Sequence, residues 1–315
     1  MFARVLIPTD FSRYAQKMQD CAAEMPGVRE IILLNVIDAA NPMNLEKKGW
    51  SYDSLIKDAI ARLDEQAEHL RHLGQKTGLK VKPVLKVIVE PMSGADGVNM
   101  QRLEPQPDVE LIEGGGTGDA IQKAADEENA SLIVMGAQGK GLVEGIFLGS
   151  VSTEVLRGAK TDLLIVRHQL MESSENVGAS ADFCRNIFSR VLITTDFSEA
   201  AGDAVALAKS LEGMQEVLLA HVIAKGKEID EPAKKLNLLR DELEAPGRRI
   251  TVHVLEGNAA NEILSLAEKQ KASLIIMSSQ GKGWLKQIRV GSVTFDVARR
   301  AKQPVMVVRP AKSQR

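Results

Sequence analysis

Short, predominantly apolar runs recur along the chain, and stretches with helical patterning separate them. From the N-terminus to the C-terminus, these runs are 5–8, 31–37, 131–135, 163–166, 191–194, 217–223, 273–277 and 305–308. They do not alternate between apolar and polar residues, which is typical of strands buried on both faces of a parallel sheet. One helical stripe between the first two runs consists of Tyr14, Met18, Cys21, Ala22 and Met25. The alternation predicts an α/β chain of doubly wound units.

The pattern occurs twice because the sequence is an internal repeat. Residues 2–12 (FARVLIPTDFS) match 188–198 (FSRVLITTDFS) at nine of eleven positions, with an offset of 186. Residues 130–141 match 272–283 at nine of twelve positions, with an offset of 142, so the first copy carries 44 extra residues between 37 and 130. We therefore expect tandem domains at 1–168 and 187–315, joined by a polar linker at 169–186.

The enlarged first copy contains an insertion near 89–108, which has three prolines and no clear period. Residues 109–114 (VELIEG) resemble 252–257 (VHVLEG), so we expect the third strand to resume after the insertion. A long loop in a compact domain is often functional. A lid, a docking arm and a plain surface insertion all fit the sequence.

Composition excludes several classes of protein. There are 40 Lys plus Arg against 42 Asp plus Glu, only 3% of residues are aromatic, and no apolar run is long enough to span a bilayer. We therefore expect neither a membrane protein nor a dedicated nucleic-acid-binding protein. Cys21 and Cys184 form no CxxC pair and no metal-ligand spacing, so we expect two buried, inert thiols in a reducing compartment. With no signal-peptide pattern at the N-terminus, the expected location is cytoplasmic.

The candidate chemistry begins with a glycine-rich segment after the third run. Gly136 and Gly139 precede Gly149-Ser150, which opens a predicted helix over 151–157 with Ser150 as its cap. Glycines allow backbone amides to approach a phosphate, and a helix N-terminus attracts anions. The segment is neither a Walker A loop nor a GxGxxG fingerprint.

An acidic residue follows the first strand of each copy, Asp10 and its equivalent Asp196. Ligands of open α/β sheets bind outside the carboxyl ends of the strands. A carboxylate there suits ribose hydroxyls rather than phosphate, so Asp10 and the glycine loop together would span a nucleotide. The alternative is that Asp10 only caps the helix that begins near Ser12 and that the glycines only form turns.

These residues resemble the nucleotide-binding subclass of the universal stress proteins. The family signature is Gly-x2-Gly-x9-Gly-[Ser/Thr], which Gly136, Gly139, Gly149 and Ser150 satisfy. In the second copy Ser278 replaces the first glycine, while the spacing is kept. The resemblance implies a five-stranded parallel sheet of order 3-2-1-4-5 in each copy, flanked by helices. It also implies ATP or AMP between strands 1 and 4, and association through the fifth strands, either within the chain as a pseudo-dimer or between two chains.

Carried over residue by residue, the resemblance implies two nucleotide sites. The site of the first copy would consist of Pro8, Thr9, Asp10, Val36, Met135, Gly136, Gly139, Gly149, Ser150, Val151 and Ser152. The site of the second copy would consist of Thr194, Thr195, Asp196, Val222, Met277, Gly281, Gly291, Ser292, Val293 and Thr294. The loops also differ in charge, because the second carries Lys282, Lys286 and Arg289, whereas the first carries Lys140 and Glu144. We therefore expect unequal sites.

The leading functional hypothesis is a binding module, a stress-response regulator whose interactions with a protein partner change when it holds adenine nucleotide. No histidine or evident general base lies in either glycine loop, so no catalytic residue and no metal ligand is predicted. The first alternative is slow hydrolysis of ATP assisted by Mg²⁺ that bridges the phosphates. The second alternative is an interaction protein in which one or both pockets stay empty.

Overall fold

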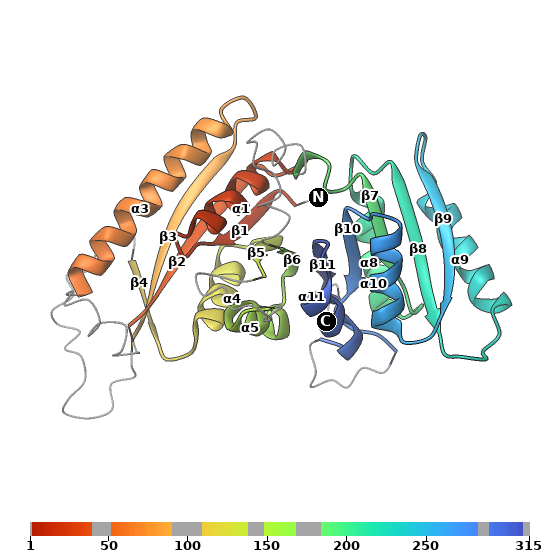
Figure 1. Cartoon of the computed structure of the whole chain (residues 1–315). Coiled ribbons are helices and arrows are strands. Elements are labelled where there is room, and N and C mark those ends of the chain that lie inside the picture. The colour runs from red at the N-terminus through yellow and green to blue at the C-terminus, as the bar shows by residue number, and fades with distance from the viewer. Residues whose placement is uncertain are drawn as a thin grey trace.

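The chain forms one continuous eleven-stranded sheet covered by helices (Figure 1). The computed structural model describes residues 2–39, 52–89, 109–137, 148–167, 184–282 and 290–310. The strands of the first copy are β1 (Arg4–Pro8), β2 (Glu30–Asp38), β3 (Lys80–Val89), β4 (Val109–Glu113), β5 (Leu132–Gly136) and β6 (Asp162–Val166). Its helices are α1 (Arg13–Glu24), α3 (Tyr52–Leu73), α4 (Thr117–Glu127) and α5 (Ser150–Gly158).

The second copy repeats this order of elements. Its strands are β7 (Arg190–Thr194), β8 (Glu216–Ile223), β9 (Arg249–Glu256), β10 (Leu274–Ser278) and β11 (Val305–Val308). Its helices are α8 (Glu199–Ser210), α9 (Asp230–Leu243), α10 (Ala259–Lys269) and α11 (Ser292–Arg300). The doubly wound α/β fold predicted from the apolar runs is therefore confirmed.

The sheet order is β4-β3-β2-β1-β5-β6-β11-β10-β7-β8-β9. The second copy thus has the order 3-2-1-4-5, and the first copy has the same order with β4 added outside its third strand. The expectation that residues 109–114 resume the third strand is wrong, because β3 already pairs with the whole of β2 and β4 is a separate strand parallel to β3. The buried ammonium of Lys86 on β3 joins Glu110 of β4, which explains why this extra strand attaches there.

The extra residues of the first copy fall in two places. From Glu30 of β2 to its partner Lys80 of β3 the chain advances 50 residues, whereas from Glu216 to its partner Arg249 it advances 33, so 17 of the 44 extra residues lie between β2 and β3. Eight of these 17 residues lengthen the helix, since α3 has 22 residues and α9 has 14. The predicted insertion, apart from Val89, and most of the predicted linker lie outside the described residues.

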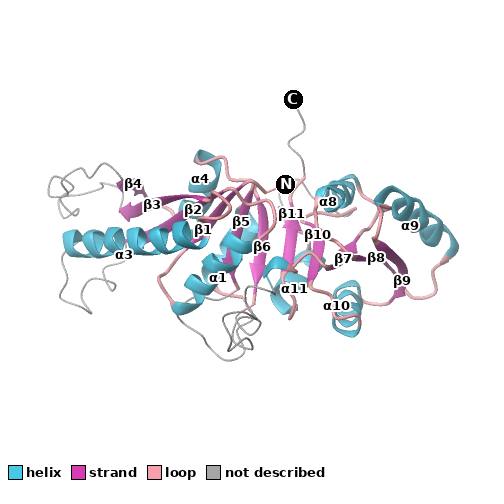
Figure 2. Ribbon diagram, turned by 90° about the horizontal axis from the view of Figure 1, so that it is seen from above, coloured by secondary structure: helices cyan, strands magenta, loops and turns pink. Residues whose placement is uncertain are grey.

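Helices lie on both sides of the strands (Figure 2). One buried apolar cluster joins the sheet to α1, α3, α8 and α9, and the other joins it to α4, α5, α10 and α11. The apolar stripe predicted before β2 is the inner face of α1, where Met18, Cys21 and Ala22 are buried. No helix in the ranges that the structure describes has the length and apolar character needed to cross a bilayer.

The two copies are joined through their fifth strands. β6 and β11 pair antiparallel, with Leu163 opposite Val307, Leu164 opposite Met306 and Ile165 opposite Val305. Leu164 and Met306 are equivalent in the repeat, so a local pseudo-two-fold axis passes between them. The pseudo-dimer within the chain is the arrangement found, and it uses the edges through which two chains would otherwise pair.

Two buried arginines tie the ends of these strands to the opposite copy. Arg167, which follows β6, donates hydrogen bonds to the carbonyl oxygens of Ala298 and Ala301 at the end of α11. Arg309, which follows β11, donates reciprocally to the carbonyl oxygen of Leu156 at the end of α5, at 2.6 Å. Burial lowers the pKa of Arg167 to about 10. Positive charge at a helix C-terminus complements the carbonyl groups that the helix leaves unpaired.

The expectation of two free thiols is wrong. Cys21 of α1 and Cys184, in the described end of the predicted linker, form a disulfide with a Cα–Cα distance of 5.1 Å. Both residues are buried, as expected, but they lie 163 residues apart in sequence. A pairing over this distance depends on how the copies pack and leaves no spacing pattern. The disulfide is a second covalent path between the copies.

Replacing Cys21 and Cys184 together with serine should lower the free energy of unfolding by about 2–4 kcal/mol, because the bond restricts the unfolded chain. Urea unfolding without reductant checks this. Added reductant should destabilise the native protein and leave the double variant unchanged. Two reactive thiols per chain, counted in denatured protein purified without reductant, would contradict the disulfide.

Asp162→Asn should stabilise the protein at neutral pH. Burial raises the pKa of Asp162 to about 6, although the Arg309 N–H donates to its carboxylate at 2.8 Å. The pKa of an unfolded Asp is near 3.9, so between about pH 4 and 6 the folded state binds more protons than the unfolded state. The free energy of unfolding therefore falls as the pH rises through this range. Urea unfolding at pH 5 and 7 should show this fall in the native protein and not in Asp162→Asn, with a gain of about 2 kcal/mol at pH 7. Asp241→Asn, at an exposed carboxylate, is the control; equal pH dependence in all three proteins would disprove the assignment.

Candidate nucleotide site

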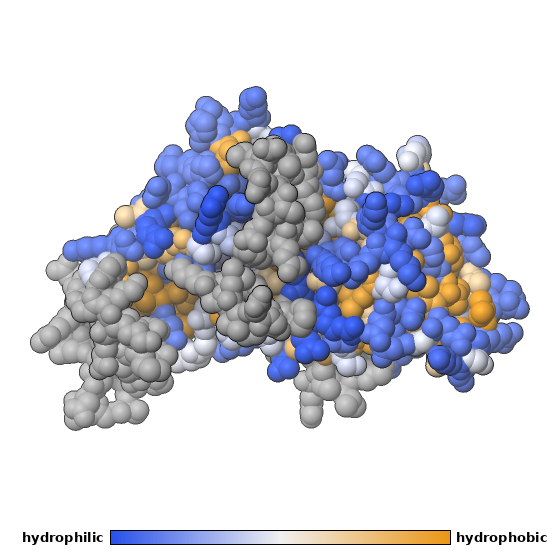
Figure 3. Space-filling view, viewed as in Figure 1, coloured by the Kyte–Doolittle hydropathy of each residue, from blue (hydrophilic) through white to orange (hydrophobic). Residues whose placement is uncertain are grey.

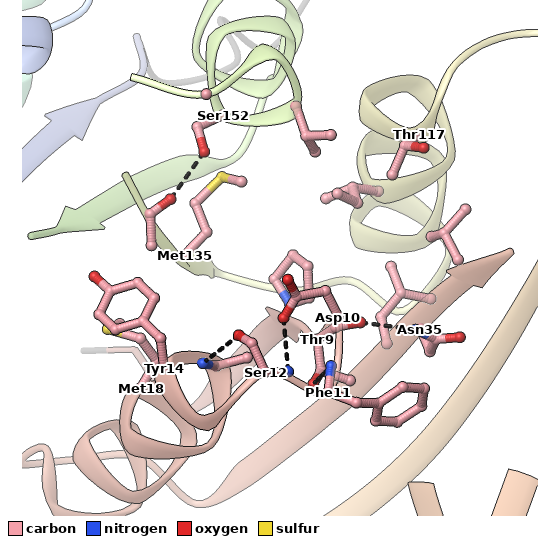
Figure 4. A pocket seen from close by; sticks show the side chains of 18 of the residues that line it. Thr9, Asp10, Phe11, Ser12, Tyr14, Met18, Asn35, Thr117, Met135 and Ser152 are labelled. Carbon is pink, nitrogen blue, oxygen red and sulfur yellow. Dashed lines mark hydrogen bonds between the residues drawn. The ribbon is translucent and has the colours of Figure 1, made fainter. Parts of the chain in front are cut away.

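The larger of two related cavities lies at the carboxyl ends of β1 and β5, where the strand order reverses (Figure 4). At this point α1 and α4 pack on opposite faces of the sheet and leave a crevice between them. The cavity has a volume of about 860 Å³. Pockets of 300–1,000 Å³ are typical of small-molecule sites.

The structure brings nearly all the site residues predicted in the first copy to this cavity. Those that line it are Pro8, Thr9, Asp10, Val36, Met135, Gly136, Gly149, Ser150, Val151 and Ser152. Gly139, Lys140 and Glu144 lie outside the described residues. Residues from four separate segments of the sequence therefore converge on one space.

A hydrogen-bonded turn holds Asp10 at the cavity. Its Oδ1 accepts from the Ser12 N–H at 2.9 Å, and Ser12 in turn caps α1 through the Ala15 N–H. The alternative that Asp10 itself caps the helix is therefore wrong. Phe11, between them, has a φ of 60°, which is an uncommon conformation for a bulky residue. Phe197 has the same φ in the second copy, so the strained turn is built twice.

The N-terminus of α5 faces the same cavity without a side-chain cap. Its N-cap is Gly149 and not Ser150, which is the first helical residue, so the predicted cap is wrong. The Gly149 N–H donates to the Ala137 carbonyl at 2.7 Å, which fixes the entry to the helix. The first-turn residues Ser150, Val151 and Ser152 line the cavity. Uncapped amide groups at a helix N-terminus form an anion site.

The hydroxyl group of Ser152 has a structural task. It donates to the Gly136 carbonyl oxygen at 2.8 Å, and Thr294 donates in the same way to Ser278 in the second copy at 2.7 Å. These bonds attach the helix N-terminus to the end of the strand. An anion at this point would therefore meet backbone amides rather than these hydroxyl protons.

The sequence reasoning missed one side chain in each pocket, Asn35 and its equivalent His221. Asn35 Nδ2 donates to the Thr9 carbonyl oxygen at 2.8 Å, and His221 Nδ1 lies 2.7 Å from the Thr195 carbonyl oxygen. Since a carbonyl only accepts, this contact assigns the proton to Nδ1 and leaves Nε2 as an acceptor. The sequence could have indicated both residues, because each directly precedes a predicted site residue, Val36 or Val222.

The sequence reasoning also missed a wall that only the first cavity has. Its α3 lining residues are Leu55, Asp58, Ala59 and Arg62. The Arg62 guanidinium lies 4.4 Å from the centroid of the Phe11 ring, and its Nη2 donates to the Phe11 carbonyl oxygen at 3.3 Å. No residue of α9 lines the second cavity. The longer α3 therefore gives the first cavity a helical wall that the described lining of the second lacks.

The second cavity is smaller, about 480 Å³. The predicted residues that line it are Thr194, Thr195, Asp196, Val222, Met277, Gly281, Gly291, Ser292, Val293 and Thr294. Ser278, the residue in place of the first glycine, also lines it, and its Oγ accepts from the Gln280 N–H at 3.2 Å. Lys286 and Arg289 lie outside the described residues.

In the second copy the loop after β10 closes onto the acidic residue. The Lys282 N–H donates to Asp196 Oδ2 at 2.6 Å, and Oδ1 accepts from Ser198. Burial alone would raise the pKa of Asp196, but the hydrogen bonds from Ser198 and Lys282 outweigh it and lower that pKa. A Cβ atom at Gly281 would lie 2.5 Å from Oδ2, so this approach requires glycine. The loop after β10 and this carboxylate are therefore in direct contact in the second copy.

Neither pocket shows a metal centre in the part of the chain that the structure describes. There, no group of three or more His, Cys, Asp or Glu side chains could hold a metal ion.

Comparisons with known proteins agree with the tandem architecture. The model of the universal stress protein family matches residues 1–167 and 188–309. A universal stress protein of Methanocaldococcus jannaschii is 34% identical over 152 residues, which cover 41% of this chain and 86% of that protein. A universal stress protein of Mycobacterium tuberculosis is 25% identical over 261 residues, which cover 78% of this chain and 77% of that protein.

A solved structure extends the similarity over both copies. The crystal structure of a universal stress protein from Archaeoglobus fulgidus superposes with a TM-score of 0.66 at 25% identity. The match covers 99% of this chain and 97% of that chain. The two-copy arrangement is therefore similar over nearly the full length of both proteins.

Proposed function

The chain belongs to the universal stress protein family, and on that premise we propose that it binds an adenine nucleotide, ATP or AMP, in the cavity of the first copy. The observation that carries the proposal is the pairing of Asp10 with the uncapped N-terminus of α5 on one cavity. A carboxylate accepts hydrogen bonds from ribose hydroxyls, and helix amides attract phosphate. The two ends of a nucleotide thus meet groups of the matching chemistry.

The remaining wall fits a base. Asn35 and Val36 belong to β2, beside Asp10 on the side away from α5, and Ile121 of α4 adds an apolar surface. With its Nδ2 donating to Thr9, Asn35 keeps its Oδ1 as an acceptor for an amino group of the base. In the second cavity His221 would offer Nε2 instead. We propose that adenine occupies this end of each cavity.

We propose a binding module rather than an enzyme. No histidine lies among the described residues that line the first cavity, and the Asp10 carboxylate already accepts from Ser12. The protein would act as a stress-response regulator whose partner contacts depend on the bound nucleotide. In this proposal Mg²⁺ binds to the phosphates of ATP and needs no dedicated protein ligands.

The two sites should bind ATP with affinities that differ at least tenfold, the first being tighter. The second cavity is smaller, and Ser278 stands where the first cavity has Gly136, so its backbone approaches a phosphate less closely; about 1.4 kcal/mol corresponds to tenfold. Calorimetric titration of the full chain, stripped of nucleotide, should resolve two classes. Asp10→Ala should remove the tight class, and the matched variant Asp196→Ala should keep it. Two equal sites in the native protein would refute the asymmetry.

Protein purified without added nucleotide should release ATP or AMP on denaturation, as mass spectrometry would detect. Incubation with ATP and Mg²⁺ should produce no phosphate above the level given by Asp10→Ala. Steady release that disappears in Asp10→Ala would instead establish the hydrolase. Absence of both co-purified nucleotide and ATP binding would leave the first cavity without its proposed ligand.

A further inference from the structure

The sheet ends differently on its two sides. In the first copy β4 covers residues Leu85–Val89 of the third strand, and the uncovered part of that strand contains Lys80, Lys82 and Pro83. Lysine and proline at an edge discourage pairing with another chain. In the second copy β9 is the last strand of the sheet order, and its sequence, RITVHVLE, has neither lysine nor proline. Figures 1 and 2 show β9 at the outer end of the molecule.

The edge strand β9 is eight residues long, and most of its residues are only partly buried. Every residue of β9 between its two exposed ends is half-buried, although Ile250, Val252 and Val254 pack against the core. Figure 3 shows apolar side chains at the surface toward this end of the molecule. A long, apolar, unpaired edge strand is a template for pairing with another strand.

The sequence around β9 is complementary to itself. In a two-fold antiparallel pair the axis is perpendicular to the sheet, so each residue faces one that lies an even number of positions away. The β6–β11 pair already has this form, with Leu164 opposite its equivalent Met306. Centred on Val252, the same geometry places Ile250 opposite the partner's Val254. It places Arg248 opposite the partner's Glu256.

The two charges that this register pairs have no ion-pair partner among the described residues. Arg248 donates to the Leu243 carbonyl oxygen, and Glu256 accepts from the Gly226 N–H. On the same face, the residues between them are the three β-branched apolar side chains. Facing apolar pairs flanked by opposite charges stabilise antiparallel strands.

We propose that β9 is a self-association edge, through which two copies of this chain join their sheets in an antiparallel β9–β9 pair centred on Val252. The interface is isologous, so it closes as a dimer and does not grow into a fibre. It lies at the end of the sheet opposite β4, away from the strands that join the two copies.

A charge-reversal cycle on the full chain tests the register. Sedimentation velocity over a range of concentrations should show a dimer. Arg248→Glu and Glu256→Arg should each weaken dimerisation at least tenfold, because each places like charges opposite one another. The double variant should restore it to within about threefold. Lys80→Glu, at the equivalent edge of the first copy, is the matched control and should have no effect.

A cysteine variant tests the centre of the pair independently. Val252→Cys should form a covalent dimer under mild oxidation, since the axis places this residue opposite itself. Thr251→Cys, one residue away, should crosslink much less. A monomer at all concentrations, a dimer indifferent to the charge reversals, or a double variant as weak as the single variants would each overturn the proposal. Circular dichroism confirms that each variant is folded.

Discussion

The pairing of β6 with β11 is the contact on which the rest of the molecule depends. Three apolar residue pairs form the ladder, and the arginines at the two strand ends each bond helix carbonyl oxygens of the other copy. A buried guanidinium needs hydrogen-bond acceptors, and both arginines find carbonyl acceptors on the opposite copy. The disulfide between Cys21 and Cys184 adds a covalent constraint on the same arrangement. Eleven strands thus behave as one sheet with two outer edges.

Once the copies are joined, their sites can diverge. The repeat builds the same turn twice, with Asp10 and Asp196 each accepting from a serine N–H. The longer α3 then adds a wall to the first cavity, and in the second cavity Ser278 stands where the first has Gly136. The larger volume and the additional helical wall belong to the same cavity. The asymmetry therefore favours one principal site, in the first copy.

The sequence predicted what depends on local pattern. Apolar runs identified the buried strands, and the repeated TDFS segment identified the turn that carries Asp10 and Asp196. What it missed depends on contacts between distant segments. The disulfide forms only because α1 packs against the segment that contains Cys184. Ser150 was mistaken for the helix cap because the hydrogen bond from the Gly149 N–H to the Ala137 carbonyl, which starts the helix one residue earlier, is not visible in the sequence. β4 was mistaken for the third strand because short apolar strands resemble each other, while the bond from Lys86 to Glu110 is visible only in three dimensions.

Because the two copies have different sequences, the two outer edges of the sheet can carry different residues. In a symmetric pair of identical domains, a residue that protects one edge protects the other as well. Here Pro83 and β4 protect the third strand of the first copy, while Arg248 and Glu256 bracket an uncovered strand in the second. Leaving an apolar edge open costs solubility unless another strand covers it. At the opposite end of the sheet the last strand, β4, is only five residues long and carries Glu110 and Glu113, so the longer edge of β9 is best explained by a partner strand, and its own sequence supplies the complementary one.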